Sequence, residues 1–561
     1  MYDLKICNGK IIDGTGNDVF NGDLGIKDGK VIAIGDAPDT AIREINADGQ
    51  VVCPGFVDIH THYDAQIFWD RNLSISPWHG VTTAVVGNCG FGVAPTKTDH
   101  REMIMRTLEK VEGMNVDALR SGLGDDWPFE SFPEYLDAID NLRPAINVGV
   151  LMGHTPLRTF VMGEEATERE ASDDEISQMC DLLADGIKAG ALGFATSKAS
   201  THVGFEGRPV PSRVANIKEI NALCDILGSL DKGVIQATVG RGLFLDEFEQ
   251  IAKRTRRPIT WTALLAGLSL GKGTHEDQLA DSQALSAKGL KISPQVTPRP
   301  LNFEYQFKEP FPFEAISLFR PVSAADFDGK CRIYKDPEFR NAFKERMKTI
   351  RASFQSSFAM TVISQYDPEP DLDERRLFNV AEERGVNPID LALDFAVASN
   401  LDARFRMPVA NQNEDEVEPL LRSDVTVLGL SDAGAHASQL CDACQPTYFL
   451  KRWVREKEVF SLQEAIHMLT MRTAEVMGIA DRGRLAIGKP ADVVVLDPAT
   501  VGDGPLQRVY DFPAGADRLI SQASGITNVL VNGVVVRDHG EDTATVNGNL
   551  PGQLLRGGMA A

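Results

Sequence analysis

The sequence predicts an α/β protein built on a (β/α)8 TIM barrel, with a small β-sandwich domain formed by both termini. Eight short apolar segments alternate with helical patterns along the middle of the chain, and both ends contain short strands joined by glycine turns. The chain has 561 residues, of which 43% are hydrophobic, which is enough for a large core and a second domain.

The eight predicted strands are short, rich in β-branched residues and apolar on both faces. This composition is typical of parallel strands that are covered by helices. Amphipathic patterns such as DEISQMCDLLADGIKAG lie between several of them, and eight such units favour a closed barrel over an open sheet. The segments are residues 56–62, 82–88, 146–154, 190–196, 233–238, 258–264, 290–296 and 424–432.

The domain boundaries follow from the change of pattern at each end. Residues 1–55 and 481–561 contain short strands with Asn-Gly and Asp-Gly turns, so we expect them to form the two parts of the β-sandwich around a barrel at 56–480. Two insertions, near 97–135 and 297–345, follow predicted strands and should lie over the active face. The second can be a lid, a packed subdomain or an oligomer contact.

Charge and composition exclude several classes of partner. A net charge of −23 argues against binding to nucleic acid or to an anionic membrane. The N-terminus lacks a signal-peptide pattern, and no apolar run approaches the ~20 residues that span a bilayer. Eight scattered cysteines predict reduced thiols in the cytoplasm, with Cys441 and Cys444 interpreted as ordinary loop cysteines. A homo-oligomer is compatible with this sequence.

Three residues at strand ends carry chemistry. His60 and His62 close the first predicted strand, where side chains two residues apart point the same way and can share one metal ion. Asp432 ends the last predicted strand, where a carboxylate can take a proton from water and pass it to a leaving group. The alternative for Asp432 is a helix cap or a turn.

Six motifs follow each other over essentially the whole chain: PGFVDIHTHYD, TTAVVGNCGFGVAP, GHTPLR, GALGFATS, LSDAGAH and RTAEVMGIADRGRLAIGKPADVVVLD. Together they resemble the N-acyl-D-amino-acid deacylases (D-aminoacylases) of the amidohydrolase superfamily. The resemblance implies a (β/α)8 barrel, a β-sandwich built from both termini, zinc, and hydrolysis of the amide of N-acylated D-amino acids.

The resemblance also implies roles for individual residues. His60 and His62 match the metal histidines of the first strand, Cys89 matches the metal-bridging cysteine, and Asp432 matches the catalytic aspartate, which we also count as a metal ligand. The substrate would be small and would carry a carboxylate. The residues expected to contact it are His154, Arg158, Arg241, Arg299 and His436.

Two departures from the family pattern concern the metal. The family has metal histidines at the ends of strands five and six, where this sequence has Thr238 and Thr262-Ala263. Hydroxyl groups are poor zinc ligands, so we expect one zinc ion on the His60/His62/Asp432 side and regard a second site as doubtful. Lys198, as a carboxylated bridge, and His202 are speculative additional ligands.

Three functions stay open on the sequence alone. The first is a metal-dependent amide hydrolase, acting on carbon–nitrogen bonds other than peptide bonds. The second is an amidohydrolase acting on a lactam, a cyclic imide or another acyl amide, because loops set substrate choice. The third is a metal-poor barrel that binds a small molecule without hydrolysing it.

Overall fold

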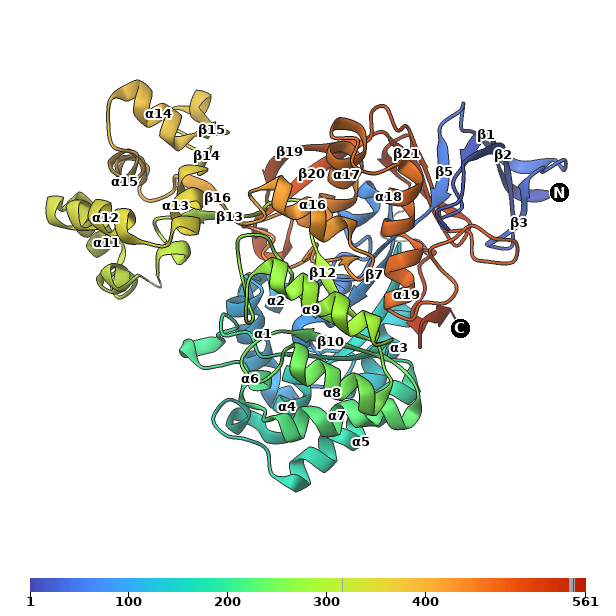
Figure 1. Ribbon diagram of the computed structural model, residues 1–561, viewed down its shortest axis with the longest axis horizontal. Coiled ribbons are helices and arrows are strands. Elements are labelled where there is room, and N and C mark those ends of the chain that lie inside the picture. Colours follow the sequence, from blue (N-terminus) through green and yellow to red (C-terminus); the bar gives the residue numbers. More distant parts are fainter. Residues whose placement is uncertain (315, 544–547, 549, 561) are drawn as a thin grey trace. The chain divides into compact units, whose positions relative to one another are not determined.

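The computed structural model describes residues 1–314, 316–543, 548 and 550–560 (Figure 1). The chain divides into two compact units. The first comprises Met1–Leu264, Ser269–Arg299 and Glu418–Ala561, and the second comprises Leu265–Leu268 and Pro300–Val417. Within the described residues, no helix combines the length and the apolar character needed to cross a membrane.

An eight-stranded parallel sheet forms the centre of the first unit. Its strands follow each other in chain order: β6 (Phe56–Asp58), β7 (Val81–Val86), β8 (Asn147–Gly153), β9 (Gly193–Ser197), β10 (Val234–Thr238), β11 (Ile259–Thr262), β12 (Ile292–Val296) and β17 (Val427–Leu428). A parallel bridge between Thr61 and Ala433 joins the chain after β6 to the chain after β17, which closes the barrel. Each of the eight predicted segments contains or overlaps one of these strands.

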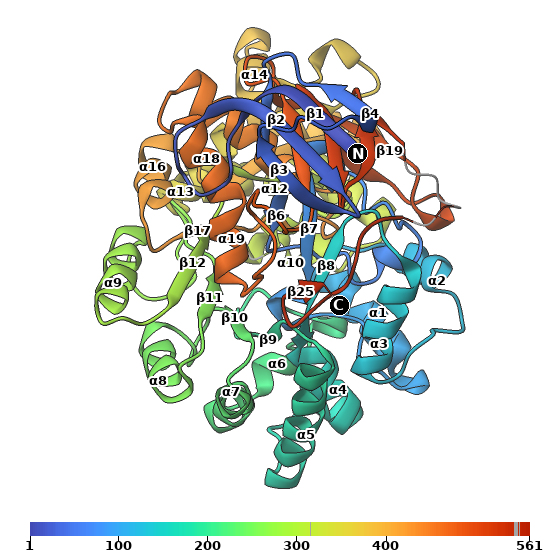
Figure 2. The same cartoon turned by 90° about the vertical axis from the view of Figure 1, so that its right-hand side faces the viewer.

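Helices surround this sheet, as Figure 2 shows for the side that carries β9–β12. The barrel strands are buried along almost their whole length, which matches their apolar sequences. The helix bounds are α4 (His154–Met162), α5 (Asp173–Ala189), α6 (Pro211–Val214), α7 (Ile217–Leu230), α8 (Leu245–Thr255), α9 (His275–Ala287), α17 (Gln445–Phe449), α18 (Leu462–Leu469) and α19 (Met471–Val476). Segment 97–135 contains α1 (Arg101–Val111), α2 (Val116–Leu123) and the start of α3 (Phe132–Leu142).

Both ends of the chain meet in a second, nine-stranded sheet. The N-terminal and C-terminal segments are joined where β5 pairs antiparallel with β18, for example at Val52 and Val495. The sheet consists of β1 (Tyr2–Ile11), β2 (Phe20–Lys27), β3 (Lys30–Gly35), β4 (Ala41–Asn46), β5 (Val51–Pro54), β18 (Val493–Leu496), β21 (Ile526–Val531), β22 (Val534–Asp538) and β23 (Glu541–Asp542). A separate hairpin joins β19 (Gly502–Val509) and β20 (Arg518–Ser524). The predicted fold class, a barrel with a β-rich domain from both termini, is confirmed.

The second unit has its own sheet and its own core. Four strands, β13 (Leu301–Gln306), β16 (Arg404–Ala410), β14 (Val362–Gln365) and β15 (Arg375–Arg376), pair antiparallel. Its helices include α11 (Phe327–Lys335), α12 (Pro337–Thr349), α13 (Ala352–Ala359), α14 (Leu377–Arg384) and α15 (Pro388–Ala398). Buried aromatic rings such as Phe313, Phe319 and Phe343 pack in its core. Segment 297–345 therefore leads into an independently packed unit that continues to Val417.

Candidate active site

Two histidines and a cysteine gather at the carboxyl end of the first barrel strands. His60 and His62 lie just after β6, and Cys89 lies in the turn after β7. One donor atom from each lies within 4.8 Å of the other two, and Cys89 Sγ is 3.4 Å from His60 Nε2. All three side chains are buried. The period-two alternation of a strand brings both imidazoles to the same end of the barrel.

A hydrogen bond sets the orientation of His60. Its Nδ1 lies 2.7 Å from Gln295 Oε1, an acceptor, so Nδ1 carries the proton and Nε2 keeps its lone pair toward Cys89. Gln295 is itself held, because its Nε2 donates to Thr260 Oγ1 at 3.2 Å. Burial lowers the pKa of His60 to about 4, so the ring stays neutral, the form that binds metal.

Asp432 joins this group from the last strand. Its Oδ1 lies 3.3 Å from His60 Nε2 and 3.8 Å from His62 Nε2. The backbone N–H of Asp432 donates to the carbonyl of His60 at 3.1 Å, so closure of the barrel itself places the carboxylate. Burial raises the pKa of Asp432 to about 7. A carboxyl with that pKa can both accept and release a proton near neutral pH.

The sequence analysis missed one acidic residue at this site. Glu112 follows α1, in the inserted segment after β7, and its Oε2 lies 3.6 Å from His62 Nε2. Burial, with the negative charges of Asp432 and Asp64, raises the pKa of Glu112 well above its usual range. No spacing in the sequence identifies Glu112 as a site residue, because an inserted helix can place a side chain at the site from any of its positions.

The ends of β10 and β11 carry hydroxyls instead of histidines. Thr238 and Thr262 hydrogen-bond to the side chain of Cys89, and Thr262 Oγ1 donates to Thr238 Oγ1 at 3.1 Å. Gln236 Oε1 accepts the backbone N–H of Cys89 at 2.8 Å. A thiol, two imidazoles and nearby carboxylates form a donor set that suits zinc. Within the described residues, this is the one cluster of metal-binding side chains, so the donors fit a single ion.

His154 and Arg158 do not line this site. Both are fully buried and bind the carboxylate of Glu219: His154 Nε2 lies 2.8 Å from Glu219 Oε1, and Arg158 Nη1 donates to Glu219 Oε2. Arg158 Nη2 also donates to the carbonyl of Arg169 at 2.9 Å. The expected contact of these two residues with substrate is therefore corrected, because their polar groups are used in a structural network.

This network predicts a stability effect that depends on pH. Burial raises the pKa of Glu219, but its hydrogen bonds and the charges of His154 and Arg158 outweigh burial and hold it below the usual value. Glu219 therefore contributes stability above its unfolded pKa of 4.5, and this contribution is lost as the pH falls below that value. We expect Glu219→Gln to lower the free energy of unfolding at pH 7 by about 3 kcal/mol, because Arg158 keeps an uncompensated buried charge.

The measurement is urea unfolding of the wild type and the variant between pH 7 and pH 4. The difference between them should shrink as the pH approaches 4. Glu249→Gln is the control, because it removes only the pairs of Glu249 with the exposed ammonium groups of Lys253 and Lys288 and should cost less than about 1 kcal/mol. A cost for Glu219→Gln equal to that of the control would contradict the structural role.

The two speculative metal ligands, Lys198 and His202, have other surroundings. Lys198 Nζ donates to the carbonyls of Arg213 and Ala215 at 2.5 and 2.6 Å, so it is not placed as a carboxylated metal bridge, and that prediction is corrected. His202 is half-buried, and its Nδ1 lies 2.7 Å from Ser197 Oγ. Burial and the charges of His436, Arg213 and His60 lower its pKa to about 3.

The remaining predicted substrate contacts divide into one buried arginine and two accessible side chains. Arg299 forms an ion pair with Asp442 at 3.1 Å and donates to the carbonyl of Cys441 at 3.0 Å, so it anchors the loop after Asp432 rather than a substrate. Arg241 is exposed on the loop after β10, and His436 is half-buried on the loop after Asp432.

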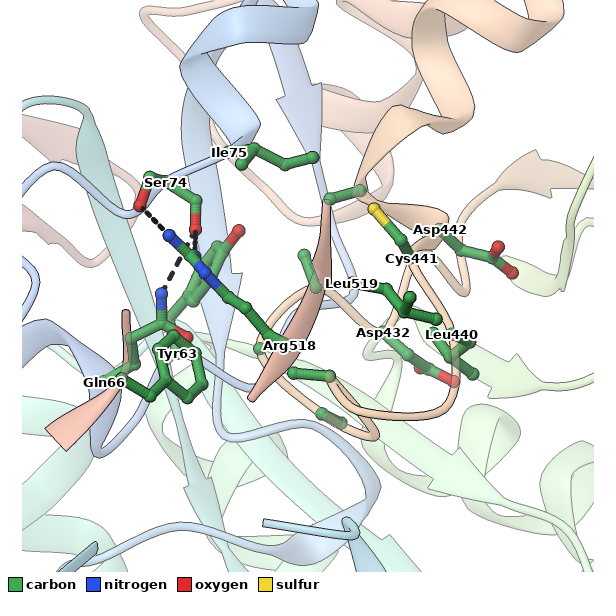
Figure 3. A pocket seen from close by; sticks show the side chains of 16 residues that line it. Tyr63, Gln66, Ser74, Ile75, Asp432, Leu440, Cys441, Asp442, Arg518 and Leu519 are labelled. Atoms are coloured by element: carbon green, nitrogen blue, oxygen red, sulfur yellow. Dashed lines mark hydrogen bonds between the residues drawn. The ribbon is translucent and has the colours of Figure 1, made fainter. Parts of the chain in front are cut away.

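A small pocket borders Asp432 on the side of the loop that follows it (Figure 3). Tyr63, Gln66 and Arg518 lie on one side, and Asp432 and Cys441 lie on the other. Arg518 donates to the carbonyl of Ser74 at 2.8 Å and forms an ion pair with Asp511. Its guanidinium is therefore used by the fold and is not available for a substrate carboxylate.

The sequence pattern that defines the amidohydrolase family matches residues 43–303 and 367–537. The chain belongs to the amidohydrolase family. It is 29% identical to a D-aminoacylase of Alcaligenes xylosoxydans xylosoxydans, over 95% of this chain and 94% of that protein. It is 27% identical to an N-acyl-D-glutamate deacylase of the same organism, over 99% of this chain and 96% of the relative.

Solved structures agree with this assignment. The N-acyl-D-glutamate deacylase of Bordetella bronchiseptica, complexed with zinc and a phosphonate inhibitor, has a TM-score of 0.67 and 26% identity, and 99% of both chains is covered. A crystal structure of D-aminoacylase has a TM-score of 0.66 and 26% identity, with the same coverage. This amidohydrolase is a metal-dependent enzyme that hydrolyses carbon–nitrogen bonds other than peptide bonds, which confirms the reaction class predicted from the sequence.

Proposed function

We propose that this amidohydrolase removes the acyl group from N-acyl-D-amino acids with one zinc ion held by His60, His62 and Cys89. The observation that carries the proposal is the convergence of these three donors with Asp432 at one end of the barrel. The D-amino-acid deacylases that match the chain over almost its full length support the substrate class.

Each residue at the site has a separate role in hydrolysis of the amide. When bound, the ion would polarise the carbonyl and make water a stronger nucleophile. Asp432 takes the proton from the attacking water and returns it to the leaving amine nitrogen. Gln295 holds His60 in the tautomer that keeps Nε2 free for the ion.

A cation is also needed for the free carboxylate of the amino acid. Arg158 and Arg299 are held by buried carboxylates, whereas Arg241 is exposed on the loop after β10, three residues after Thr238. We therefore assign Arg241 to the substrate carboxylate, with His436 as a second polar contact. The expected cytoplasmic location stays part of the proposal, supported by eight cysteines that are all free thiols.

The test is an assay of the purified enzyme on matched D and L forms of N-acetylated amino acids, together with a lactam and a cyclic imide. We expect turnover of D substrates only, one zinc ion per chain, loss of activity after chelation, and recovery when zinc is added. If the enzyme hydrolysed only the lactam or the imide, its substrates would be cyclic amides rather than N-acyl-D-amino acids. An enzyme purified with far less than one metal ion per chain, and inactive with added zinc, would support the metal-poor binding protein instead.

A further inference from the structure

The backbone of Cys89 has a conformation that residues other than glycine rarely adopt. Its φ is +56°, and the nearby Gly87 and Gly90 have φ +84° and +74°. A residue with a side chain keeps such a conformation only where its surroundings hold it there. Gln236 supplies one such contact, because its Oε1 accepts the backbone N–H of Cys89 at 2.8 Å. The turn that carries the thiol is therefore held by a side chain from β10.

The other end of the same amide begins a chain of hydrogen bonds that returns to Cys89. A backbone N–H can only donate, so the oxygen of Gln236 faces Cys89 and its NH2 group faces Thr262. Gln236 Nε2 donates to Thr262 Oγ1 at 3.4 Å, and Thr262 Oγ1 donates to Thr238 Oγ1 at 3.1 Å. Both threonines hydrogen-bond to the side chain of Cys89. Because each hydroxyl has one proton, the proton of Thr238 is the one that remains for a hydrogen bond to the sulfur.

Two neighbouring barrel strands hold this chain of hydrogen bonds in place. Gln236 and Thr238 are two residues apart on β10, so their side chains lie on the same face of the sheet. Thr262 is the register partner of Thr238 on β11. All three side chains are buried, and buried polar groups need hydrogen-bond partners, which here are one another and Cys89. The two strands thus hold both the backbone and the sulfur of the cysteine.

We propose that Gln236 is the positioning residue of the metal-binding cysteine, acting on both the backbone and the sulfur of Cys89. This inference rests on the metal site of the proposed function, in which the cysteine binds the ion as a thiolate. The hydrogen-bond chain offsets part of the negative charge of that thiolate and keeps the sulfur facing His60 Nε2, 3.4 Å away. The hydroxyls of Thr238 and Thr262, which are poor metal ligands, thus act on the ion through the cysteine.

The experiment uses the full chain loaded with Co²⁺, in which a sulfur-to-cobalt charge-transfer band reports the cysteine ligand. We expect Gln236→Leu to weaken Co²⁺ affinity about tenfold or more, measured by competition with a chromophoric chelator. The band should move to longer wavelength, because a sulfur that loses its hydrogen bonds donates electrons more readily. Gln278→Leu is the matched control: Gln278 is also buried, but it lies in α9 and binds Ser269, so affinity and band should stay unchanged.

A second variant separates the sulfur from the backbone. Replacing both hydroxyls, in the double variant Thr238→Val and Thr262→Val, removes the donors to the sulfur and leaves the contact between Gln236 and the backbone N–H of Cys89. The band should again move to longer wavelength, while the affinity should fall less than in Gln236→Leu. A loss of fold stability alone would not move the band.

Each outcome decides the matter. Wild-type affinity and an unmoved band in Gln236→Leu would overturn the inference while the proposed function stands. Weaker affinity with an unmoved band would also overturn it, because Gln236 would then support the fold and not the sulfur. If the wild type bound Co²⁺ without the charge-transfer band, Cys89 would not be a ligand, and the proposed metal site and the inference would fail together. Should Gln236→Leu fail to fold, an unmoved band in the double variant would overturn the inference.

Discussion

Replacing Asp432 with asparagine is expected to lower kcat/KM about 10³-fold while zinc content stays near one ion per chain. Asparagine keeps the shape of the side chain but cannot carry the proton from water to the leaving nitrogen. Zinc should remain, because His60, His62 and Cys89 supply the donors. The measurements are steady-state kinetics on an N-acyl-D-amino acid and elemental analysis of the same preparation.

Asp424→Asn is the control for this variant. Asp424 begins the predicted strand segment that Asp432 ends, and its side chain is exposed. It should retain full activity. If Asp432→Asn changed only KM, or lost its zinc together with its activity, Asp432 would act in substrate binding or metal binding rather than in proton transfer.

The barrel could be predicted because its signals are local. Each strand is a short apolar run, and alternation along the first of them places His60 and His62 on one side. The position of Asp432 at the end of the last predicted strand brings it to the same end of the barrel as soon as the strands are parallel and in chain order. The order of the strands and the residues at their ends were therefore enough to predict most of the candidate site.

The site residues whose roles the sequence did not predict depend on contacts between residues that are distant in the sequence. Arg158 resembled a substrate anchor because no sequence signal connects it with Glu219, which lies 61 residues later and neutralises it. Lys198 resembled a metal bridge, but its ammonium group donates to the carbonyls of Arg213 in α6 and of Ala215 just after it. The sequence did not identify Glu112 as a site residue, because a charged residue that follows an amphipathic helix is usually solvated.

Among the variants considered, Cys89→Ser should cause the largest loss of zinc affinity. The cysteine thiolate is a strong zinc donor, whereas a neutral hydroxyl is a poor one, as Thr238 and Thr262 already are at this site. Loss of groups that merely orient ligands costs 10–100-fold in affinity, so loss of a direct ligand should weaken zinc binding by about 100-fold or more. Zinc affinity by chelator competition and turnover at saturating zinc are the two measurements.

Cys224→Ser is the matched control, because Cys224 is equally buried but lies in α7, outside the cluster of His60, His62 and Cys89. It should bind zinc like the wild type, and any loss of stability should come from the changed packing of a buried side chain. Zinc binding by Cys89→Ser at wild-type strength would mean that two histidines and the carboxylates suffice. In that case the hydroxyls of Thr238 and Thr262 would serve to pack a thiol that never meets the metal, and the altered ends of β10 and β11 would be unrelated to metal binding.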